Sequence, residues 1–333
     1  MNITFLIGNG FDINIGMKTR YRDFYEYYTK LPTKGKSSLI KDLKNSLQED
    51  LDKWSDFEIQ FGQYCCNFTT IDDFDVVFEN IRAELARYIE NEQQRFDFDV
   101  DHRIAMYKYL ATPETFLTRA DKESIEEFKS LWKSVWNINV ISYNYSTSFE
   151  KLLGEVNEHN SIGVTGINKQ LLFKNVKHIH GYFTKDMVLG VNDSLQIDNE
   201  LLRESEDAMA AIVKPECNKA LKHLIDKDCQ KIINESNLIC LFGLSIGDTD
   251  KVWWSLIGER LKQNNVRLII FYKGEKVISE LDGYKIRRED AVVKDLFLSK
   301  TNLNEAEKQI VDERVLIGCD TDIFSIKLSE IKT

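Results

Sequence analysis

Several short apolar runs in this chain end at a glycine or a small polar residue and are followed by a helix-forming stretch. The first is Asn2–Ile7, and later ones are Ile138–Tyr143, Leu238–Phe242 and Val266–Tyr272. Runs of this length and composition are typical of buried strands. Strands that alternate with helices form βαβ units, whose parallel sheet is covered by helices on both faces. The sequence therefore predicts an α/β fold built on a parallel sheet.

Shorter apolar runs extend this prediction. Val176–Ile179 and Met187–Val191 are further strand candidates, and Val315–Cys319 and Phe324–Leu328 add two more in the charged tail. The sequence Thr147-Ser-Phe-Glu150 has the form of a capping box, which predicts the start of a helix after the strand at 138–143.

The glycines divide the chain into two kinds of sequence. Three of the 16 lie in the first sixteen residues, two lie between 17 and 153, and eleven follow from Gly154 onward. Between Tyr21 and Trp136 the apolar residues recur at helical spacing. We therefore predict one α/β core formed by residues 1–20 and 137–333, interrupted after its first strand by a large helical insertion over 21–136.

The net charge of −10 is concentrated in the predicted insertion. From Glu49 to Asp101 there are fifteen acidic and four basic residues, a balance of −11, so the rest of the chain is near +1. A run of this kind is typical of a solvated helical surface. Proteins that bind nucleic acids cluster Lys and Arg against the phosphates, so nucleic acid is an improbable partner.

The six cysteines form no C-x-x-C pair, which favours buried free thiols over a zinc site or a disulfide framework. No basic segment followed by a long apolar run opens the chain, and no run approaches the roughly 18 apolar residues of a membrane helix. The sequence predicts a cytoplasmic protein that neither crosses a membrane nor holds a metal.

The first candidate site is Gly8-Asn9-Gly10-Phe11-Asp12, directly after the first strand. Glycines at this point permit positive φ and allow backbone amides to approach a phosphate closely. Ile13 stands where the G-x-G-x-x-G fingerprint has its third glycine, so the pattern is incomplete. A phosphate or nucleotide loop and a plain tight turn both stay open.

The second candidate is Asn144, which follows Ser142 at the end of a strand and precedes a helix. Asn at such a place also serves as ordinary turn chemistry. The third is His178-Ile-His180-Gly181, in which period two places both imidazoles on one face of a strand. A histidine at a strand end followed by glycine suits a general base, and a structural histidine is the alternative.

The fourth candidate is Gly243-Leu-Ser245-Ile-Gly-Asp248-Thr-Asp250, at the entrance to a helix. Either aspartate could be a plain N-cap, and Ser245 with the nearby amides could contact a ribose or a phosphate. Ser245 is not placed as a hydrolase nucleophile, because the expected acid and histidine do not follow in chain order.

These four segments all follow predicted strands. In an open parallel sheet the carboxyl ends of the strands meet at one edge, and ligands bind there. Four strand ends with small, polar or imidazole residues at that edge predict a nucleotide cleft.

Six pieces of the sequence together resemble the bacteriophage abortive-infection AbiH family. They are Ile7-Gly-Asn-Gly-Phe-Asp12, Gly16 with Tyr21-Arg-Asp-Phe24, Trp54-Ser-Asp-Phe-Glu58, Ser142-Tyr-Asn-Tyr145, His180-Gly181 and Phe242-Gly-Leu-Ser-Ile-Gly-Asp-Thr-Asp250. The resemblance spans the chain to about residue 260. That family is similar in turn to sirtuin-like NAD-binding domains, so it implies a Rossmann-like, sirtuin-type core.

The resemblance also implies roles for single residues. Asn144 would orient the ribose or the attacking water, and His180 would be the catalytic base. The residues implied to bind NAD are Gly8, Asn9, Gly10, Phe11, Asp12, Ser142, Gly181, Gly243, Ser245 and Asp248. The zinc module of four cysteines found in sirtuins has no counterpart here, which makes water the natural acceptor, and Tyr143 replaces the Gln common before the Asn.

The expected function is that of an anti-phage abortive-infection effector that hydrolyses NAD to nicotinamide and ADP-ribose, with NAD as substrate and no metal. The alternative is a sensor that binds NAD or an ADP-ribose-like nucleotide without turnover and acts through a protein partner. A nuclease or nucleotidyl-transfer toxin ranks last, because no clustered carboxylate metal site is visible. A phage-derived trigger or partner protein is expected, and assembly into a homo-oligomer stays open.

Overall fold

The computed structural model describes residues 1–33, 38–99, 101–133, 135–154, 161–164, 170–274 and 283–331, with the backbone alone for 161–164 and 283–286. The strands are β1 (Asn2–Ile7), β2 (Trp136–Ser142), β3 (Ser161–Val164), β4 (Gln170–His178), β5 (Leu238–Phe242), β6 (Arg267–Tyr272) and β7 (Val315–Cys319). The helices are α1 (Gly10–Asn14), α2 (Tyr21–Tyr28), α3 (Ser38–Glu49), α4 (Phe57–Tyr64), α5 (Ile71–Gln94), α6 (Arg103–Ala111), α7 (Arg119–Ser130), α8 (Ser148–Leu153), α9 (Glu200–Glu204), α10 (Glu206–Ile212), α11 (Lys214–Ala220), α12 (Ile225–Glu235), α13 (Lys251–Leu261), α14 (Gly283–Ser299) and α15 (Glu305–Asp312).

The seven strands form one sheet in the order β3-β4-β2-β1-β5-β6-β7. Five neighbouring pairs are parallel, and only β3 runs antiparallel to β4 at the edge. Without β3, the strands follow the order 3-2-1-4-5-6 in the chain, which is the order of the Rossmann fold. The predicted α/β fold with a Rossmann-like parallel sheet is confirmed.

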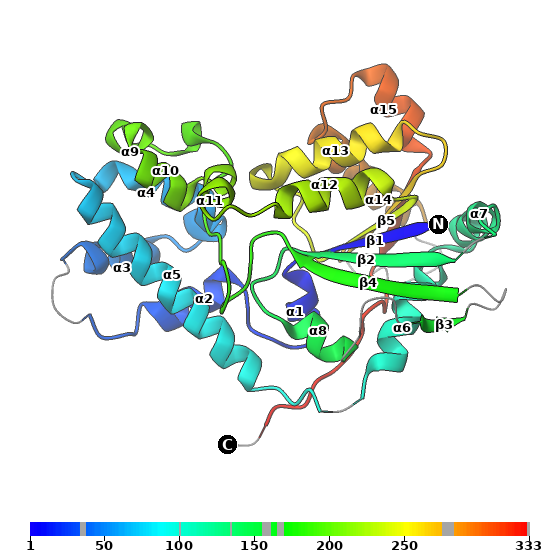
Figure 1. Ribbon diagram of the computed structural model, residues 1–333, viewed down its shortest axis with the longest axis horizontal. Helices are drawn as coiled ribbons and strands as arrows, with labels where there is room; N and C mark the ends of the chain where they lie inside the picture. The colour runs from blue at the N-terminus through cyan, green and yellow to red at the C-terminus, as the bar shows by residue number, and fades with distance from the viewer. Residues whose placement is uncertain are drawn as a thin grey trace.

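Alternation along β1 divides its side chains between two hydrophobic layers. Phe5 and Ile7 face a layer that contains residues of α1, α6, α7 and α8. Leu6 faces the opposite layer, which contains residues of α12, α13, α14 and α15. Figure 1 shows α12 and α13 on one side of the sheet and α1 and α8 on the other. Burial of both faces is what a parallel sheet requires.

A third hydrophobic cluster lies beside the sheet, and we call the elements that form it the helical lobe. Its buried side chains come from two segments of the chain, Phe24–Ile89 and Leu189–Val213. Figure 1 shows α2, α3, α4 and α5 grouped with α9 and α10 at one end of the molecule. The later residues of the predicted insertion, among them Met106 and Ile125, pack against the sheet instead. The domain boundaries at 21 and 136 stay a prediction.

Two local strand predictions were wrong. Met187–Val191 forms no strand of the sheet, although Val191 makes an isolated bridge with Val213. Phe324–Leu328 also joins no strand of the sheet, and only Phe324 and Ile326 of this segment are buried. The predicted helix start after β2 is confirmed, because α8 begins at Ser148 with Thr147 as its N-cap, although the Thr147 side chain makes no capping hydrogen bond. Glu150 contacts His178 instead of closing a capping box. In each case long-range contacts replace the local pattern that the sequence shows.

Candidate functional site

The four predicted strand ends lie in one row. Ser142, the last residue of β2, is paired with Ile7 of β1 on one side and with His178 of β4 on the other. Ile7 is paired in turn with Phe242, the last residue of β5. The strand order reverses between β1 and β5, and ligands of such folds bind at this switch point, outside the carboxyl ends of the strands.

The first and fourth loops contact each other at this point through their glycines. The Gly8 amide donates to the carbonyl of Phe242 at 2.9 Å, and the Gly10 amide donates to the carbonyl of Gly243 at 2.9 Å. A Cβ on Gly10 would lie 2.4 Å from Cα of Gly243, which is itself at φ +68°. The Phe11 amide donates to the Gly8 carbonyl. These glycines therefore join two loops, and three amides of the first loop are already engaged within the chain.

Asn9 and Phe11 also make contacts within the protein. The side-chain Nδ2 of Asn9 donates to the carbonyl of Thr19 at 2.8 Å, and its Oδ1 accepts from the Thr19 hydroxyl at 2.5 Å. Phe11 is fully buried, with its ring 5.2 Å from Phe149 and 5.4 Å from Phe324 between centroids. Asn9 thus fastens the segment that leads into the helical lobe, and Phe11 anchors α1 in the core.

Asp12 is the buried acid of the first loop. Its carboxylate accepts hydrogen bonds from the hydroxyls of Ser146, at 2.6 Å, and Ser148. Burial raises the pKa of Asp12 to about 6, against the lowering effect of both serines and of the nearby Asn144 amide. The first and second loops are thereby connected through a carboxyl group that titrates close to neutral pH.

Asn144 lies at the centre of the strand-end row and is 5% exposed. Its backbone amide donates to the Ser142 hydroxyl at 3.2 Å, and its carbonyl oxygen lies 3.1 Å from Nδ1 of His178. The other ring nitrogen of His178 contacts Glu150. Burial by itself would lower the pKa of His178, but the Glu150 carboxylate reverses the effect and raises it. His178 is therefore a structural histidine that fixes the Asn144 backbone.

His180 lies two residues beyond the end of β4 and is 7% exposed. Its ring meets the Tyr143 ring edge-on, with 5.5 Å between centroids. Its Nε2 lies 3.3 Å from Oδ1 of Asp250, within ion-pair distance but not aligned as a hydrogen bond. Gly181 has φ +64°, and a Cβ there would lie 2.0 Å from the Asp186 carbonyl oxygen, so the chain can turn sharply after His180 only at glycine. The two histidines thus contact different residues.

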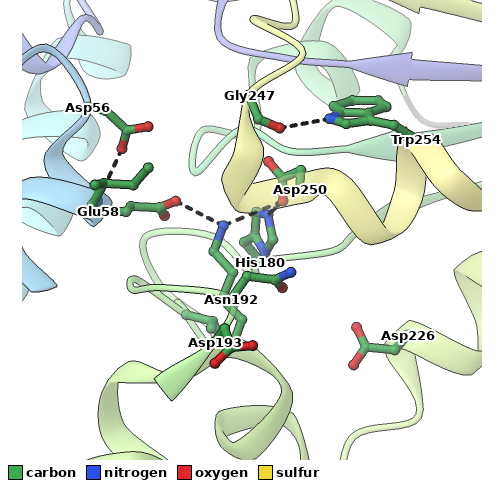
Figure 2. A network of polar contacts seen from close by, with 12 residues as sticks. Asp56, Glu58, His180, Asn192, Asp193, Asp226, Gly247, Asp250 and Trp254 are labelled. Carbon is green, nitrogen blue, oxygen red and sulfur yellow. Dashed lines mark hydrogen bonds and ion pairs between the residues drawn. The ribbon is translucent and has the colours of Figure 1, made fainter. Parts of the chain in front are cut away.

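An ion-pair chain extends from His180 into the helical lobe. Nζ of Lys214 lies 3.5 Å from Oδ1 of Asp250 and 2.9 Å from Oε2 of Glu58 in α4. Figure 2 shows Glu58, Asp250 and His180 converging on the same point from different elements. Burial would raise the pKa of Asp250 and lower that of Lys214. Their mutual attraction, with Glu58 and His180, reverses both effects, so Asp250 titrates below its usual range and Lys214 above it.

The rest of the fourth loop is more open. Ser245 is exposed, and Asp248 is exposed and pairs with Lys300 at 2.7 Å. Asp250 is the N-cap of α13 by position, but its side chain caps nothing and turns to Lys214 and His180. The Trp254 indole donates to the Gly247 carbonyl at 2.9 Å and holds the loop against α13 (Figure 2).

Buried polar atoms without a hydrogen-bond partner gather at this edge. Of the nine such side-chain atoms in the described part of the chain, five belong to Tyr143, Asn144, Glu150 and His180. They are the Tyr143 hydroxyl, both amide atoms of Asn144, Oε2 of Glu150 and Nε2 of His180. Native proteins leave few buried polar groups unpaired, because each costs about 1–3 kcal/mol. Their concentration indicates a place prepared for a polar ligand or for water.

Surface hollows occur elsewhere. One of about 370 Å³ lies between α12 and the sheet and includes Asn2 and Asn137 at the amino ends of β1 and β2. Another of about 540 Å³ lies within the helical lobe. Within the described ranges, no three His, Cys, Asp or Glu side chains are grouped so that they could hold a metal ion. Of the helices described, none has the length and apolar character needed to cross a membrane.

Sequence reasoning did not find Lys214, Tyr143 as a site residue, or the use of Asp250 as an ion-pair partner. Lys214 stands in no recognisable motif, and its partners lie 36 and 156 residues away in the chain. Glu58 did belong to a motif, Trp54-Ser-Asp-Phe-Glu58, but nothing in that segment shows that its carboxylate reaches the sheet edge. The only signal in the sequence was a lysine followed by Pro215, and it is too common to be diagnostic.

Comparison with known proteins supports the resemblance noted from the sequence. A search of curated proteins finds no match. The family model for bacteriophage abortive infection AbiH matches residues 4–272, most of the chain. The match covers all four strand-end segments as well as the Glu58 segment and Lys214. The chain therefore belongs to the bacteriophage abortive infection AbiH family, whose role is in abortive infection by phage.

Proposed function

We propose that this AbiH protein hydrolyses the N-glycosidic bond of NAD, giving nicotinamide and ADP-ribose. The observation that carries the proposal is the group of unpaired buried polar atoms on Asn144 and Tyr143, directly after β2 and beside the Rossmann switch point. Dinucleotides bind at this place in related folds. The unpaired atoms offer donors and acceptors for the hydroxyls of a ribose and for one attacking water.

The reaction needs an oriented substrate and water, a general base, and a site from which bulk water is excluded. Water attacks C1′ of the nicotinamide ribose, the bond from C1′ to the ring nitrogen breaks, and nicotinamide leaves as a neutral molecule with the bonding electrons. The proton released by the water passes to His180 and then to solvent. Asn144, held by its backbone to Ser142 and His178, orients the water or the ribose hydroxyls.

Burial of the site supports cleavage through an oxocarbenium-like ribose. Exclusion of bulk water strengthens every electrostatic interaction inside, and the preorganised groups need not reorient during the reaction. The phosphates would have to be held by groups other than the amides of Gly8, Gly10 and Phe11, which are bonded within the chain. Ser245, exposed on the neighbouring loop, supports binding of the adenosine side.

The test is incubation of the purified chain with NAD, with nicotinamide and ADP-ribose separated by chromatography. Wild type should release both products in equal amounts, and His180→Gln and Asn144→Ala should each lower the rate at least a hundredfold while the circular dichroism spectrum is retained. Glu216→Gln is the matched control, because Glu216 is paired with Lys219 at an exposed position of α11. The proposal fails if folded wild type leaves NAD intact, including protein isolated from phage-infected cells.

The same experiment addresses the nucleotide sensor. A rise in melting temperature with NAD that survives in His180→Gln, together with no product from wild type, would favour binding without turnover. In infected cells, an unchanged NAD concentration during a protective response would exclude the depletion of NAD as the protective step.

A further inference from the structure

We propose that Asp250 is a positioning residue for His180, fixing the ring proton on Nε2 and leaving Nδ1 to accept a proton, and that Lys214 and Glu58 hold the Asp250 carboxylate in place. The proposal rests on the proposed function, because it describes how the base of that site is prepared. It assigns a task to three residues that no sequence motif connects with one another.

The geometry around the ring determines the tautomer. A neutral imidazole carries its proton on one nitrogen only, and a carboxylate can accept but not donate. Oδ1 of Asp250 lies 3.3 Å from Nε2 of His180, so it favours the form protonated at Nε2. The pair is not aligned as a hydrogen bond, and catalytic hydrogen bonds of this kind commonly tighten when the complex forms.

Asp250 is itself held by a buried cation. Its carboxylate would be costly to bury alone, and Lys214, only 5% exposed, supplies the opposite charge. Lys214 is closer to Glu58, at 2.9 Å, than to Asp250, at 3.5 Å. The ammonium therefore forms a close ion pair with Glu58 in the helical lobe and a longer ion pair with Asp250 at the sheet edge.

The backbone between His180 and Lys214 is fixed at both ends. The amide of Val188 donates to the carbonyl of His180 at 2.8 Å, and the amide of Lys214 donates to the carbonyl of Val191 at 2.9 Å. Gly190 permits the close packing of this segment, since a Cβ there would lie 1.8 Å from the Ile212 carbonyl oxygen. The base and the lysine are thus parts of one rigid assembly, although 34 residues separate them.

The first experiment measures the tautomer and does not depend on activity. The chain has five histidines, so two-bond ¹H–¹⁵N correlation spectra at mildly alkaline pH can be assigned by the loss of one ring in His180→Gln. Wild type should show His180 with a protonated Nε2 and an unprotonated Nδ1. In Asp250→Asn the two ¹⁵N shifts should move toward each other as the tautomers mix. Unchanged shifts in Asp250→Asn would overturn the proposal.

The second experiment separates this proposal from the proposed function. If wild type hydrolyses NAD, Asp250→Asn should lower kcat at least a hundredfold and change KM less than threefold, because the residue acts through His180 and not on substrate. A loss confined to KM would contradict the positioning role. If wild type shows the expected tautomer but leaves NAD intact, the proposed function fails while the assignment of Asp250 stands.

A double variant tests the outer part of the chain of ion pairs. Lys214→Met alone would leave two buried carboxylates facing each other, so the charge-neutral pair Glu58→Gln with Lys214→Met is the informative change. It should retain the fold, lower kcat about tenfold and mix the His180 tautomers in part. Glu216→Gln, at an exposed position of the same helix α11, should match wild type in both measurements. A double variant with wild-type kcat and tautomer would remove Lys214 and Glu58 from the proposal.

Discussion

The backbone of Gly10 lies directly against that of Gly243, with a 2.9 Å hydrogen bond from the Gly10 amide to the Gly243 carbonyl. The contact joins the loops after β1 and β5 at the point where the strand order reverses. Both partners are main chain, so neither can move aside for a side chain. The position of the candidate site depends on this contact.

Gly10→Ala should therefore destabilise the protein. The added Cβ would lie 2.4 Å from Cα of Gly243, and overpacking of this kind costs about 1–3 kcal/mol. Urea denaturation measures the loss. Gly247→Ala is the control, because the nearest atom to its Cβ would be 3.6 Å away, and it should change the free energy of unfolding by less than about 0.5 kcal/mol. Equal stability of the two variants would contradict the close contact.

Tyr143→Phe should separate binding from folding. The Tyr143 hydroxyl is buried without a partner, so its removal should leave the melting temperature of the free protein unchanged or slightly raised. If the hydroxyl serves the ligand, kcat/KM for NAD should fall about three- to tenfold.

The neighbouring Tyr145→Phe provides the comparison for Tyr143. Its hydroxyl donates to the Val188 carbonyl at 2.9 Å, so that variant should lose about 1 kcal/mol of stability. A Tyr143→Phe variant as destabilised as Tyr145→Phe would show that the Tyr143 hydroxyl has a structural partner.

Asp12 should make stability depend on pH between about 4 and 6. Burial raises its pKa from 3.8 to about 6, so the folded protein favours the neutral carboxyl. The contribution of Asp12 titration to the free energy of unfolding is complete below pH 3.8 and is lost as the pH rises through about 6. The difference is of the order of 3 kcal/mol. The free energy of unfolding of wild type and Asp12→Asn should be measured by denaturation across this range. As the pH rises, wild type should lose stability relative to the variant. Parallel curves would show that Asp12 titrates normally.

Glu114→Gln should be the most destabilising of these variants. Nζ of Lys129 lies 2.7 Å from Oε1 of Glu114, and both side chains are about 5% exposed or less. Removal of one partner leaves a buried ammonium unpaired, which costs about 3–5 kcal/mol. Glu123→Gln in the exposed pair with Arg119 on α7 should be nearly neutral by the same denaturation assay. A loss below 1 kcal/mol for Glu114→Gln would mean that water reaches Lys129.

The strands were predictable because their apolar runs are local. Asn2–Ile7, Leu238–Phe242 and Val315–Cys319 were placed with their observed bounds, and Val266–Tyr272 differs from β6 by one residue. β3 and most of β4 were not found, because Gln170–His178 mixes apolar with polar residues and most of its side chains are only half-buried, next to the edge strand β3. The sequence predicted the class of fold, a Rossmann-like parallel sheet. The order of its strands could not be predicted, because no single segment encodes which strands pair.

Within the candidate site, the sequence identified the polar strand ends but not their partners. Asn144 and His180 were singled out because they follow strands, which is a local feature. Asp250 was interpreted as a helix cap or a loop residue, and Lys214 was missed. Both residues matter because of ion pairs with residues more than thirty positions away in the chain. No local sequence pattern encodes which buried charged residues form a pair.

The helical lobe has a consequence for how the chain is made. Its apolar interior is built from Phe24–Ile89 and Leu189–Val213, with strands β2, β3 and β4 of the sheet encoded between them. During translation the first segment leaves the ribosome before the seven buried side chains of the second segment, out of 23 in the cluster, have been made. About a hundred residues must follow before the second segment can cover it. The order of synthesis therefore delays completion of the lobe, and with it the pairing of Glu58 with Lys214, until strands β2, β3 and β4 have emerged.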